Sequence, residues 1–226
     1  MGVRRIAIVG AGGMAREVAS AIHWINRTKP QFEFVGYLVS DLSKLGPQDS
    51  REAVLGDFRW IEKHRHAVDA LAVGVGTPSV RVKLAQQLCT AFPEIEWPAI
   101  VHPTAILDYD SAKLGEGIFV GAGFVSTVNL DLQPFALCNF GTTIGHESQI
   151  GRGSVINPGA NISGGVVIED EVLIGTGAQV LQYLTVGSGA TVGAGAVVTR
   201  NIPNRTTVVG IPAREVKKTI AAFAAH

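Results

Sequence analysis

The sequence is short of cysteine, aromatic residues and net charge. Two cysteines, Cys89 and Cys138, are too few for a disulfide framework, and no CxxC pair indicates a zinc site. Nineteen basic residues balance 19 acidic ones, so no net field attracts nucleic acid or an anionic membrane surface. Hydrophobic residues make up 46% of the chain, which excludes a disordered protein although only 7% of it is aromatic.

Long apolar runs are also absent. The first apolar run, Ile6 to Val9, ends at Gly10 and is too short for the core of a signal peptide. No uninterrupted apolar stretch approaches the roughly 20 residues that span a bilayer. We therefore expect a cytoplasmic protein that contacts neither membrane nor nucleic acid.

The first part of the chain alternates strand and helix patterns. The run Ile6 to Val9 reads as a buried parallel strand, and residues 32–39 and 70–75 read as two more. Two stretches between and after them repeat apolar residues at helical spacing: Val18, Ile22 and Ile25 in one, and Val80, Leu84 and Leu88 in the other. Strands that alternate with helices predict a small Rossmann-like βαβ domain with a parallel sheet.

From about residue 102 the pattern changes to a period of six, and glycine, at 27 of 226 residues, is in excess. Of the fifteen residues at this spacing, thirteen are Leu, Ile or Val: Leu114, Val120, Ser126, Leu132, Cys138, Ile144, Ile150, Ile156, Ile162, Ile168, Ile174, Val180, Val186, Val192 and Val198. Glycine often follows directly, which would permit a tight turn, and a small residue often stands four places on.

A six-residue period of short strand and tight turn predicts a parallel β-helix of five coils, with three hexads in each coil. The sequence here resembles the hexapeptide-repeat acyltransferases, and the resemblance implies a triangular prism that winds left-handed. Cys138 occupies an inward position of the repeat, which indicates a buried apolar side chain rather than a catalytic thiol.

Three loops follow strands of the first domain and should meet at one edge of its sheet. They contribute the candidate substrate-binding residues Gly12, Gly13, Met14, Ser40, Asp41, Gly76 and Thr77. Glycines between a strand and a helix let phosphates approach the backbone. A tight turn without a ligand would also account for the first loop, and a surface arginine opening a helix would account for Arg81.

His146 and Glu147 follow Ile144-Gly145 at a predicted turn of the prism, where side chains face outward. Glu147 could orient and electrostatically support the imidazole as a base. A solvated surface pair is the alternative. A metal site of three histidines is disfavoured because His102 is the only other histidine between residues 99 and 210.

A glycine-rich first loop, His102-Pro103-Thr104-Ala105, the stretch Asn139 to Glu147 and Gly210 to Arg214 together resemble a narrower family. This family comprises bacterial sugar-nucleotide acetyltransferases, including sialic acid O-acetyltransferase and UDP-4-amino-sugar N-acetyltransferase, and the resemblance covers essentially the whole chain. It implies that His146 accepts the proton, that Glu147 supports it and that Asn139 lies near the reacting groups. Acetyl-CoA would pass Val155, Gly164, Thr176 and Ala194. Met14 departs from the aromatic residue or histidine that members often carry there.

The sequence patterns divide the chain into residues 1–98, 99–210 and a tail, 211–226, that reads as a short amphipathic helix with Val216, Ile220 and Phe223. The resemblance implies that the first part binds a sugar nucleotide and that the second is a left-handed β-helix that binds acetyl-CoA. The resemblance implies transfer of acetyl to the amino group of a nucleotide-linked 4-amino-4,6-dideoxy sugar in polysaccharide biosynthesis, without a metal. Acylation of a sugar hydroxyl stays open, as do a nucleotide-dependent oxidoreductase and a non-catalytic scaffold. We expect a homotrimer with active sites between subunits.

Overall fold

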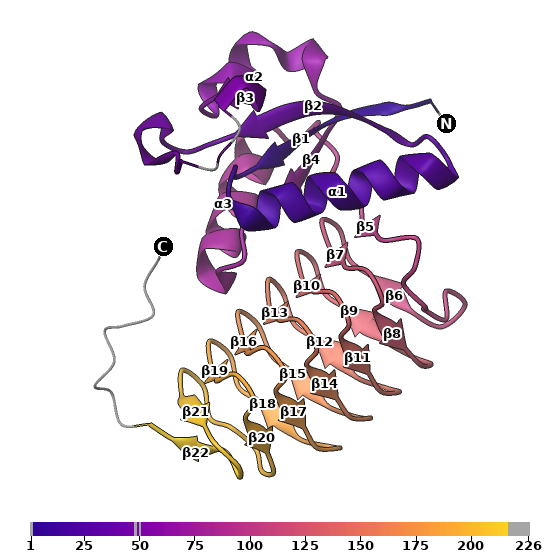
Figure 1. The fold of residues 1–226 in the computed structure, drawn as a ribbon, viewed down its shortest axis with the longest axis vertical. Coiled ribbons are helices and arrows are strands. Elements are labelled where there is room, and N and C mark those ends of the chain that lie inside the picture. Colours follow the sequence, from indigo (N-terminus) through magenta and orange to yellow (C-terminus); the bar gives the residue numbers. More distant parts are fainter. Residues whose placement is uncertain (1, 48, 50, 217–226) are drawn as a thin grey trace.

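The computed structural model describes residues 2–47, 49 and 51–216 (Figure 1). The N-terminal domain has one parallel sheet in the order β3-β2-β1-β4, packed with helices. Its strands are β1 (Arg4–Val9), β2 (Phe32–Leu38), β3 (Val54–Gly56) and β4 (Ala70–Val73). Its helices are α1 (Gly13–Thr28), α2 (Arg59–Lys63) and α3 (Pro78–Ala91), with single 3₁₀ turns at Leu42–Lys44, Arg51–Ala53 and Arg65–Ala67.

Helix α1 buries the face that its sequence predicts, and α3 does so only in part. Val18, Ile22 and Ile25 are all buried in α1. In α3, Val80 is 43% exposed, and the buried face is Pro78, Arg81, Val82, Ala85 and Leu88. Leu88 is buried and Leu84 is partly buried against the same core as predicted, but the prediction for Val80 was wrong. Arg81 is buried in its place, because its guanidinium finds backbone carbonyls to bond in the interior.

The rest of the chain winds into a three-faced prism (Figure 1). Face 1 holds β5 (Ile100–Val101), β7 (Phe119–Val120), β10 (Leu137–Cys138), β13 (Val155–Ile156), β16 (Leu173–Ile174), β19 (Thr191–Val192), β21 (Thr207–Val209) and β22 (Arg214–Glu215). Face 2 holds β8 (Val125–Ser126), β11 (Thr143–Ile144), β14 (Asn161–Ile162), β17 (Gln179–Val180) and β20 (Val197–Val198). Face 3 holds β6 (Lys113–Leu114), β9 (Asp131–Leu132), β12 (Gln149–Ile150), β15 (Val167–Ile168) and β18 (Thr185–Val186).

Three columns of turns join these faces. The 1–2 corner contains residues 121–124, 139–142, 157–160, 175–178 and 193–196. The 2–3 corner contains residues 127–130, 145–148, 163–166 and 181–184, and the 3–1 corner contains 115–118, 133–136, 151–154, 169–172 and 187–190. Each residue pairs with the residue one coil on, as Leu137 pairs with Val155, so a coil contains 155 − 137 = 18 residues.

The interior of the prism is filled by the residues that the period of six predicts to point inward. From Val120 to Val198 every sixth residue is buried, and the small residues Ala136, Thr142, Ser148, Ser154 and Ala160 are fully or almost fully buried between them. Ser126 replaces an aliphatic residue, and its hydroxyl has no hydrogen-bond partner within the described residues.

The structural reason for the glycine after each aliphatic residue differs from the prediction. A Cβ at Gly145 would lie 2.5 Å from Gly164 N, and one at Gly151 would lie 2.4 Å from Glu169 C, so these glycines admit the backbone of the next coil. The left-handed turn conformation falls two residues later, for example at Gly153 and Gly165. At that position other side chains are tolerated, and Phe135 and Glu147 adopt it too.

The N-terminal domain docks on face 1 and on the 3–1 corner. Helix α1 lies between its sheet and the prism (Figure 1), where its apolar residues form one cluster with Phe119, Leu137 and Val155. Helix α3 contacts the 3–1 corner, since a Cβ at Gly153 would meet Val82. Over the part of the chain that the structure describes, the N-terminal domain leaves face 2 and the 2–3 corner uncovered (Figure 1).

The chain after β21 corrects one expectation. Arg214–Glu215 forms β22, antiparallel to β21, rather than part of a helix. Bonds from Ala213 N to Val197 O and from Val216 N to Thr207 O hold this segment across the last coil, which gives the open strand edge a partner. The predicted helix residues Ile220 and Phe223 lie outside the described residues. Among the residues that are described, no helix has the length and apolar character needed to cross a membrane.

Candidate active site

Two of the three predicted loops meet at the carboxyl edge of the N-terminal sheet. Gly10 has a φ of +108°, and a Cβ there would lie 2.8 Å from Gly74 O, so the β1–α1 and β4–α3 loops are in contact. This is the point where strand order reverses in the sheet β3-β2-β1-β4, the usual position of a ligand crevice. A Cβ added at Gly12, Gly13 or Gly76 would meet no described atom within 4 Å, so open space lies in front of these glycines.

The third loop, after β2, has a different environment. Ser40 lines a cavity of about 280 Å³ together with Asp57, Phe58 and Arg59 and residues of α3. The Asp41 carboxylate accepts hydrogen bonds from Ser43 N at 2.9 Å and Ser43 Oγ at 2.7 Å, which caps the following 3₁₀ turn. Asp41 is thus at least partly engaged in a local cap.

The remaining residues of these loops differ in exposure. Met14 is half-buried and packs on the apolar cluster under α1. Thr77 is exposed and precedes α3, beside Gly76. Arg81, which could have been a surface arginine, is fully buried instead. The edge of the sheet therefore presents mainly backbone and small side chains, a surface that suits phosphate oxygens.

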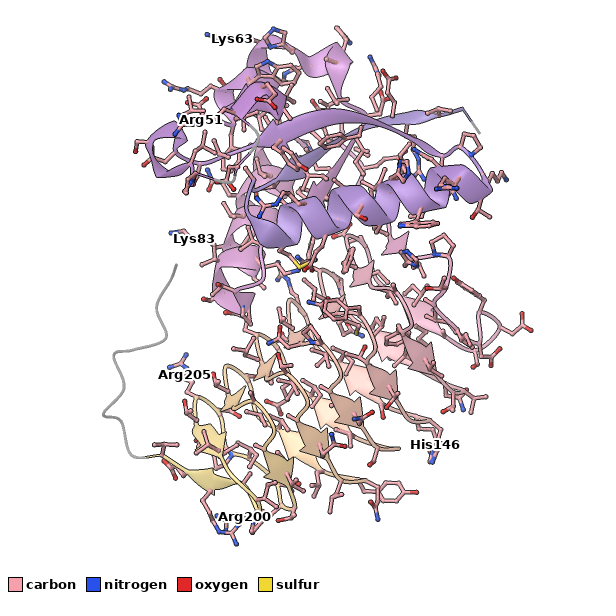
Figure 2. The ribbon with its side chains drawn as sticks, in the orientation of Figure 1. Arg51, Lys63, Lys83, His146, Arg200 and Arg205 are labelled. Carbon is pink, nitrogen blue, oxygen red and sulfur yellow. The ribbon has the colours of Figure 1, made fainter. Side chains whose placement is uncertain are left out.

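His146 projects outward from the 2–3 corner (Figure 2). Its side chain is 49% exposed, and its Nδ1 lies 3.4 Å from Glu147 Oε2. A Cβ placed on Gly164 would lie 2.4 Å from Nε2, so the imidazole rests on the backbone of the next coil. With Nδ1 directed at the carboxylate, Nε2 is the nitrogen left to accept a proton. This arrangement can act as a general base.

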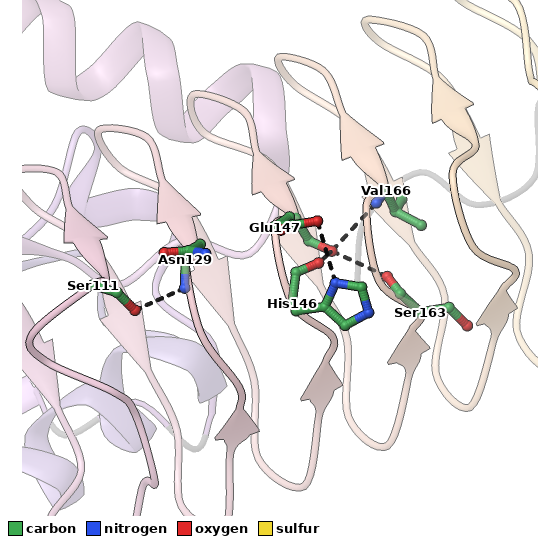
Figure 3. A network of polar contacts seen from close by, with 7 residues as sticks. Ser111, Asn129, His146, Glu147, Ser163 and Val166 are labelled. Atoms are coloured by element: carbon green, nitrogen blue, oxygen red, sulfur yellow. Dashed lines mark hydrogen bonds and ion pairs between the residues drawn. The ribbon is translucent and has the colours of Figure 1, made fainter.

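A buried hydroxyl fixes the His146 turn against the coil that carries Gly164 (Figure 3). Ser148 Oγ donates to Ser163 O at 3.0 Å and accepts from Val166 N at 3.3 Å. Gly164 lies within the turn that these two bonds hold, and its N–H donates to no acceptor in the described part of the chain. The sequence offered Ser148 only as a small inward residue, and nothing in it indicated this cross-link.

The other predicted prism residues fall in three places. Asn139, Thr176 and Ala194 lie on the 1–2 corner, where Thr176 and Ala194 are exposed one coil apart. Gly164 lies on the 2–3 corner under His146. Val155 is 1% exposed beneath the N-terminal domain, so its side chain is apart from both corners. One chain therefore does not bring Asn139 beside His146.

A second cavity, of about 220 Å³, lies between α1 and the 1–2 corner. Trp24 and Glu17 line it from the helix, while Asn139 and Phe140 line it from the prism together with His102. Burial lowers the pKa of His102, and its Nδ1 lies 2.8 Å from Thr104 Oγ1. The His102-Pro103-Thr104-Ala105 motif was the available signal for this place, but sequence alone did not connect it to Asn139.

Within the described residues no group of three His, Cys, Asp or Glu side chains is placed to hold a metal ion. Cys138 is buried in the prism, and burial raises the pKa of its thiol to about 12. A thiol that stays protonated is a poor nucleophile, which agrees with the interpretation of Cys138 as a core residue.

Comparison with known proteins gives a family model and several similar chains. Residues 5–88 match the PglD N-terminal domain family. The acetyltransferase domain of PglB from Neisseria gonorrhoeae FA1090, solved with acetyl coenzyme A, is 30% identical, with a TM-score of 0.83 over 95% of this chain and 100% of that one. PerB from Caulobacter crescentus, in complex with CoA and GDP-perosamine, is 26% identical, with a TM-score of 0.82 over 96% and 98% of the two chains.

The curated sequence relatives are also acetyltransferases. The GDP-perosamine N-acetyltransferase of Escherichia coli O157:H7 is 33% identical over 151 residues, which are 65% of this chain and 67% of that protein. Serine acetyltransferases also match, but the chain spans only about half of their length or less, as in the 49% covered in Bacillus licheniformis. An α/β domain followed by a three-faced prism is the architecture of the hexapeptide-repeat acyltransferases. The chain belongs to the sugar acetyltransferase family of PglB, PerB and the Escherichia coli enzyme, and the predicted Rossmann-like domain and left-handed β-helix are confirmed.

Proposed function

We propose that this protein transfers acetyl from acetyl-CoA to the amino group of a nucleotide-linked 4-amino-4,6-dideoxy sugar, with His146 as the general base. The observation that carries the proposal is the placement of His146, with Glu147 behind Nδ1 and Nε2 free above Gly164. The chemistry of the relatives supports it, since PerB was crystallised with CoA and GDP-perosamine.

The reaction needs one general base and one hydrogen-bond donor that stabilises the oxyanion. The neutral amine attacks the thioester carbonyl, Nε2 of His146 takes its proton, and the C–S bond breaks as the proton passes to the sulfur of CoA. The amide and free CoA are the products. No nucleophilic Ser or Cys is required, because the amine attacks the thioester directly.

In this proposal the backbone N–H of Gly164 donates the hydrogen bond to the oxyanion. This N–H has no acceptor among the described residues, and the His146 ring lies over Gly164. A backbone N–H in a turn that is held in place can stabilise the oxygen of the tetrahedral intermediate without reorganising. Ser148 keeps the two turns in register, so base and donor are fixed relative to each other.

The geometry of one chain favours a site shared between subunits. The N-terminal domain covers face 1, and His146 lies on the 2–3 corner, which is the corner opposite that face. An acceptor held by the glycine loops of one chain is therefore separated from the same chain's base by the body of the prism. A homotrimer in which the 1–2 corner of one subunit faces the 2–3 corner of the next removes this separation.

The same arrangement places the residues proposed to contact acetyl-CoA in a row along the prism. Asn139 and His146 belong to one coil, so threefold symmetry about an axis along the prism puts Asn139 level with the partner's His146. Thr176 and Ala194 follow about two and three coils further on, at roughly 4.8 Å per coil. An extended acetyl-CoA arm along this cleft would have its thioester at the base. Exposed apolar residues on these surfaces, Val125, Val128, Phe140, Leu181 and Tyr183, fit an interface.

The decisive experiment incubates the full chain with acetyl-CoA and a panel of nucleotide-linked amino sugars and their hydroxyl counterparts. Free CoA and acetylated sugar are followed by mass spectrometry. We expect one amino sugar to be acetylated to a product that resists hydroxylamine, whereas an O-acetyl ester would be cleaved by it. Acetylation of hydroxyl sugars alone would replace N- by O-transfer, and no transfer to any acceptor would refute the proposal.

The matched variants are His146→Ala and His66→Ala. Loss of general-base catalysis should lower the turnover of His146→Ala by roughly 10²–10⁴-fold, with little change in melting temperature because the residue is half exposed. His66 is an exposed histidine of the N-terminal domain, and its replacement should leave turnover unchanged. Near-normal turnover of His146→Ala would show that another group is the base.

A further inference from the structure

Arg81 is a buried cation that joins the two domains through backbone carbonyls alone. The side chain is 0% exposed. Within the N-terminal domain its Nη1 donates to Val73 O at 2.7 Å and Val75 O at 3.1 Å. Within the prism its Nε donates to Phe135 O at 2.6 Å, and its Nη2 donates to Gly117 O at 3.4 Å.

This cation has no acidic partner in the described part of the chain. Removing a guanidinium from water without a carboxylate is costly, and an apolar side chain of equal size would dock the domains without that cost. An apolar cluster of α1 residues with Phe119, Leu137 and Val155 also crosses the interface. Apolar contacts are non-directional, whereas a planar fork of N–H donors bonds its acceptors in one orientation.

The carbonyl groups that accept hydrogen bonds from Arg81 belong to the candidate nucleotide loop and to the prism. Val73 and Val75 flank Gly74 in the β4–α3 loop, which continues to the candidate substrate residues Gly76 and Thr77. Gly117 and Phe135 occupy the same left-handed turn position, with φ of 61°, in consecutive coils of the 3–1 corner. Arg81 therefore bonds the backbone of a candidate nucleotide loop to the backbone of two coils.

We propose that Arg81 is a positioning residue, which holds the β4–α3 loop at one distance and orientation from the prism and so sets where the acceptor lies relative to the base. The inference rests on the proposed function, because the acceptor is what the loop would hold. Transfer depends on near-attack geometry, and a misplacement of about 1 Å can lower a rate by about 10²-fold. Without Arg81 the domains stay docked through apolar contacts, but the loop loses its fixed position.

The test compares Arg81→Met and Arg81→Lys with Val82→Ala. Met keeps the volume and removes all four hydrogen bonds, and Lys keeps the charge without the planar fork. Val82 contacts Gly153 of the same corner without directional bonds, so Val82→Ala weakens the interface and serves as the control. Activities are compared at temperatures where all variants are equally folded.

We expect kcat for transfer to fall by about 10–100-fold in Arg81→Met, less in Arg81→Lys and under threefold in Val82→Ala, with acetyl-CoA affinity within twofold of wild type throughout. Equal losses in Arg81→Met and Val82→Ala would overturn the proposal, since they would indicate only weakened docking. If Arg81→Met does not fold, Arg81→Lys decides the question against the same control.

A second readout does not depend on catalysis. Hydrogen exchange should speed up at least tenfold in Arg81→Met at the amides of Gly74, Gly117 and Phe135, which bond to Val9 O, Trp97 O and Glu116 O. Val82→Ala should leave these amides protected. Unchanged exchange in Arg81→Met would overturn the positioning role even if the enzyme is active. A wild type that acetylates no sugar would instead refute the proposed function, while hydrogen exchange would still test whether Arg81 fixes the β4–α3 loop.

Discussion

Gly164→Ala is a substitution that should damage the reaction and spare the fold. The new Cβ would lie 2.4 Å from Nε2, 2.6 Å from Cε1 and 2.8 Å from Cδ2 of His146, and no backbone atom is among these nearest neighbours. Carbon and ring atoms need about 3.5–4.0 Å, so the imidazole must move by about 1 Å or more. His146 is half exposed and can swing away at little cost in stability. The turn itself accepts a side chain, because Phe140 and Thr176 stand at the equivalent position of another corner.

The expected result is a fall in turnover of about 10²-fold, with a melting temperature within a few degrees of wild type. Steady-state kinetics with acetyl-CoA and the acceptor, together with calorimetry, measure both quantities. Gly145→Ala is the matched control, because its Cβ would lie 2.5 Å from Gly164 N and 2.8 Å from Gly164 Cα. That clash is with backbone, so this control should lose stability first.

A double-mutant cycle completes the test. In the background of His146→Ala, the change Gly164→Ala should have almost no further effect, because the ring it displaces is gone. Full activity of Gly164→Ala would refute the assignment, since it would show that the imidazole does not act from its position above Gly164.

Gly12→Val should fold normally, because Gly12 has a φ of −73° and an added Cβ would meet no described atom within 4 Å. It should raise the KM of the sugar nucleotide and leave acetyl-CoA affinity unchanged in calorimetric titration, and normal sugar-nucleotide affinity would place the acceptor elsewhere. Cys138, whose pKa burial raises to about 12, should stay unlabelled by iodoacetamide at pH 8 while transfer proceeds, and an alkylated Cys138 in active protein would contradict its burial. Light scattering should give about three times 23.8 kDa, and a monomer at working concentration would remove the intersubunit site.

The sequence predicted the prism because its physics is local and repetitive. An aliphatic residue every sixth place specifies the inward direction, and the absence of insertions from Leu114 to Val198 leaves a single register. Even the separation of Asn139 from His146 follows from the numbers, since 146 − 139 = 7 exceeds one hexad and puts the two residues on successive corners. The outward placement of His146 could be predicted for the same reason.

Long-range contacts were beyond this kind of prediction. Helical periodicity assigned Val80 to the interior by its apolarity, but the buried position belongs to Arg81, whose acceptors Gly117 and Phe135 are distant in sequence. The contact of His146 with Gly164 likewise depends on how far the ring leans over the next coil. Such contacts depend on three-dimensional packing, which one sequence does not contain as a pattern.

One long-range feature was nevertheless present in the sequence, as a period of 18 superimposed on the period of six. The residue before each inward aliphatic faces outward, and on face 1 these residues are apolar in the coils that the N-terminal domain covers: Phe119, Leu137, Val155 and Leu173. On face 3 the corresponding residues are Lys113, Asp131, Gln149, Val167 and Thr185, and on face 2 they are Val125, Thr143, Asn161, Gln179 and Val197, so neither face has an unbroken apolar row. An outward apolar residue at every third hexad needs a cover, because exposing a row of them to water is unfavourable. The unbroken apolar row therefore marks the face on which the N-terminal domain docks, and this face lies opposite the 2–3 corner that carries His146, which is the separation that the proposed intersubunit site would bridge.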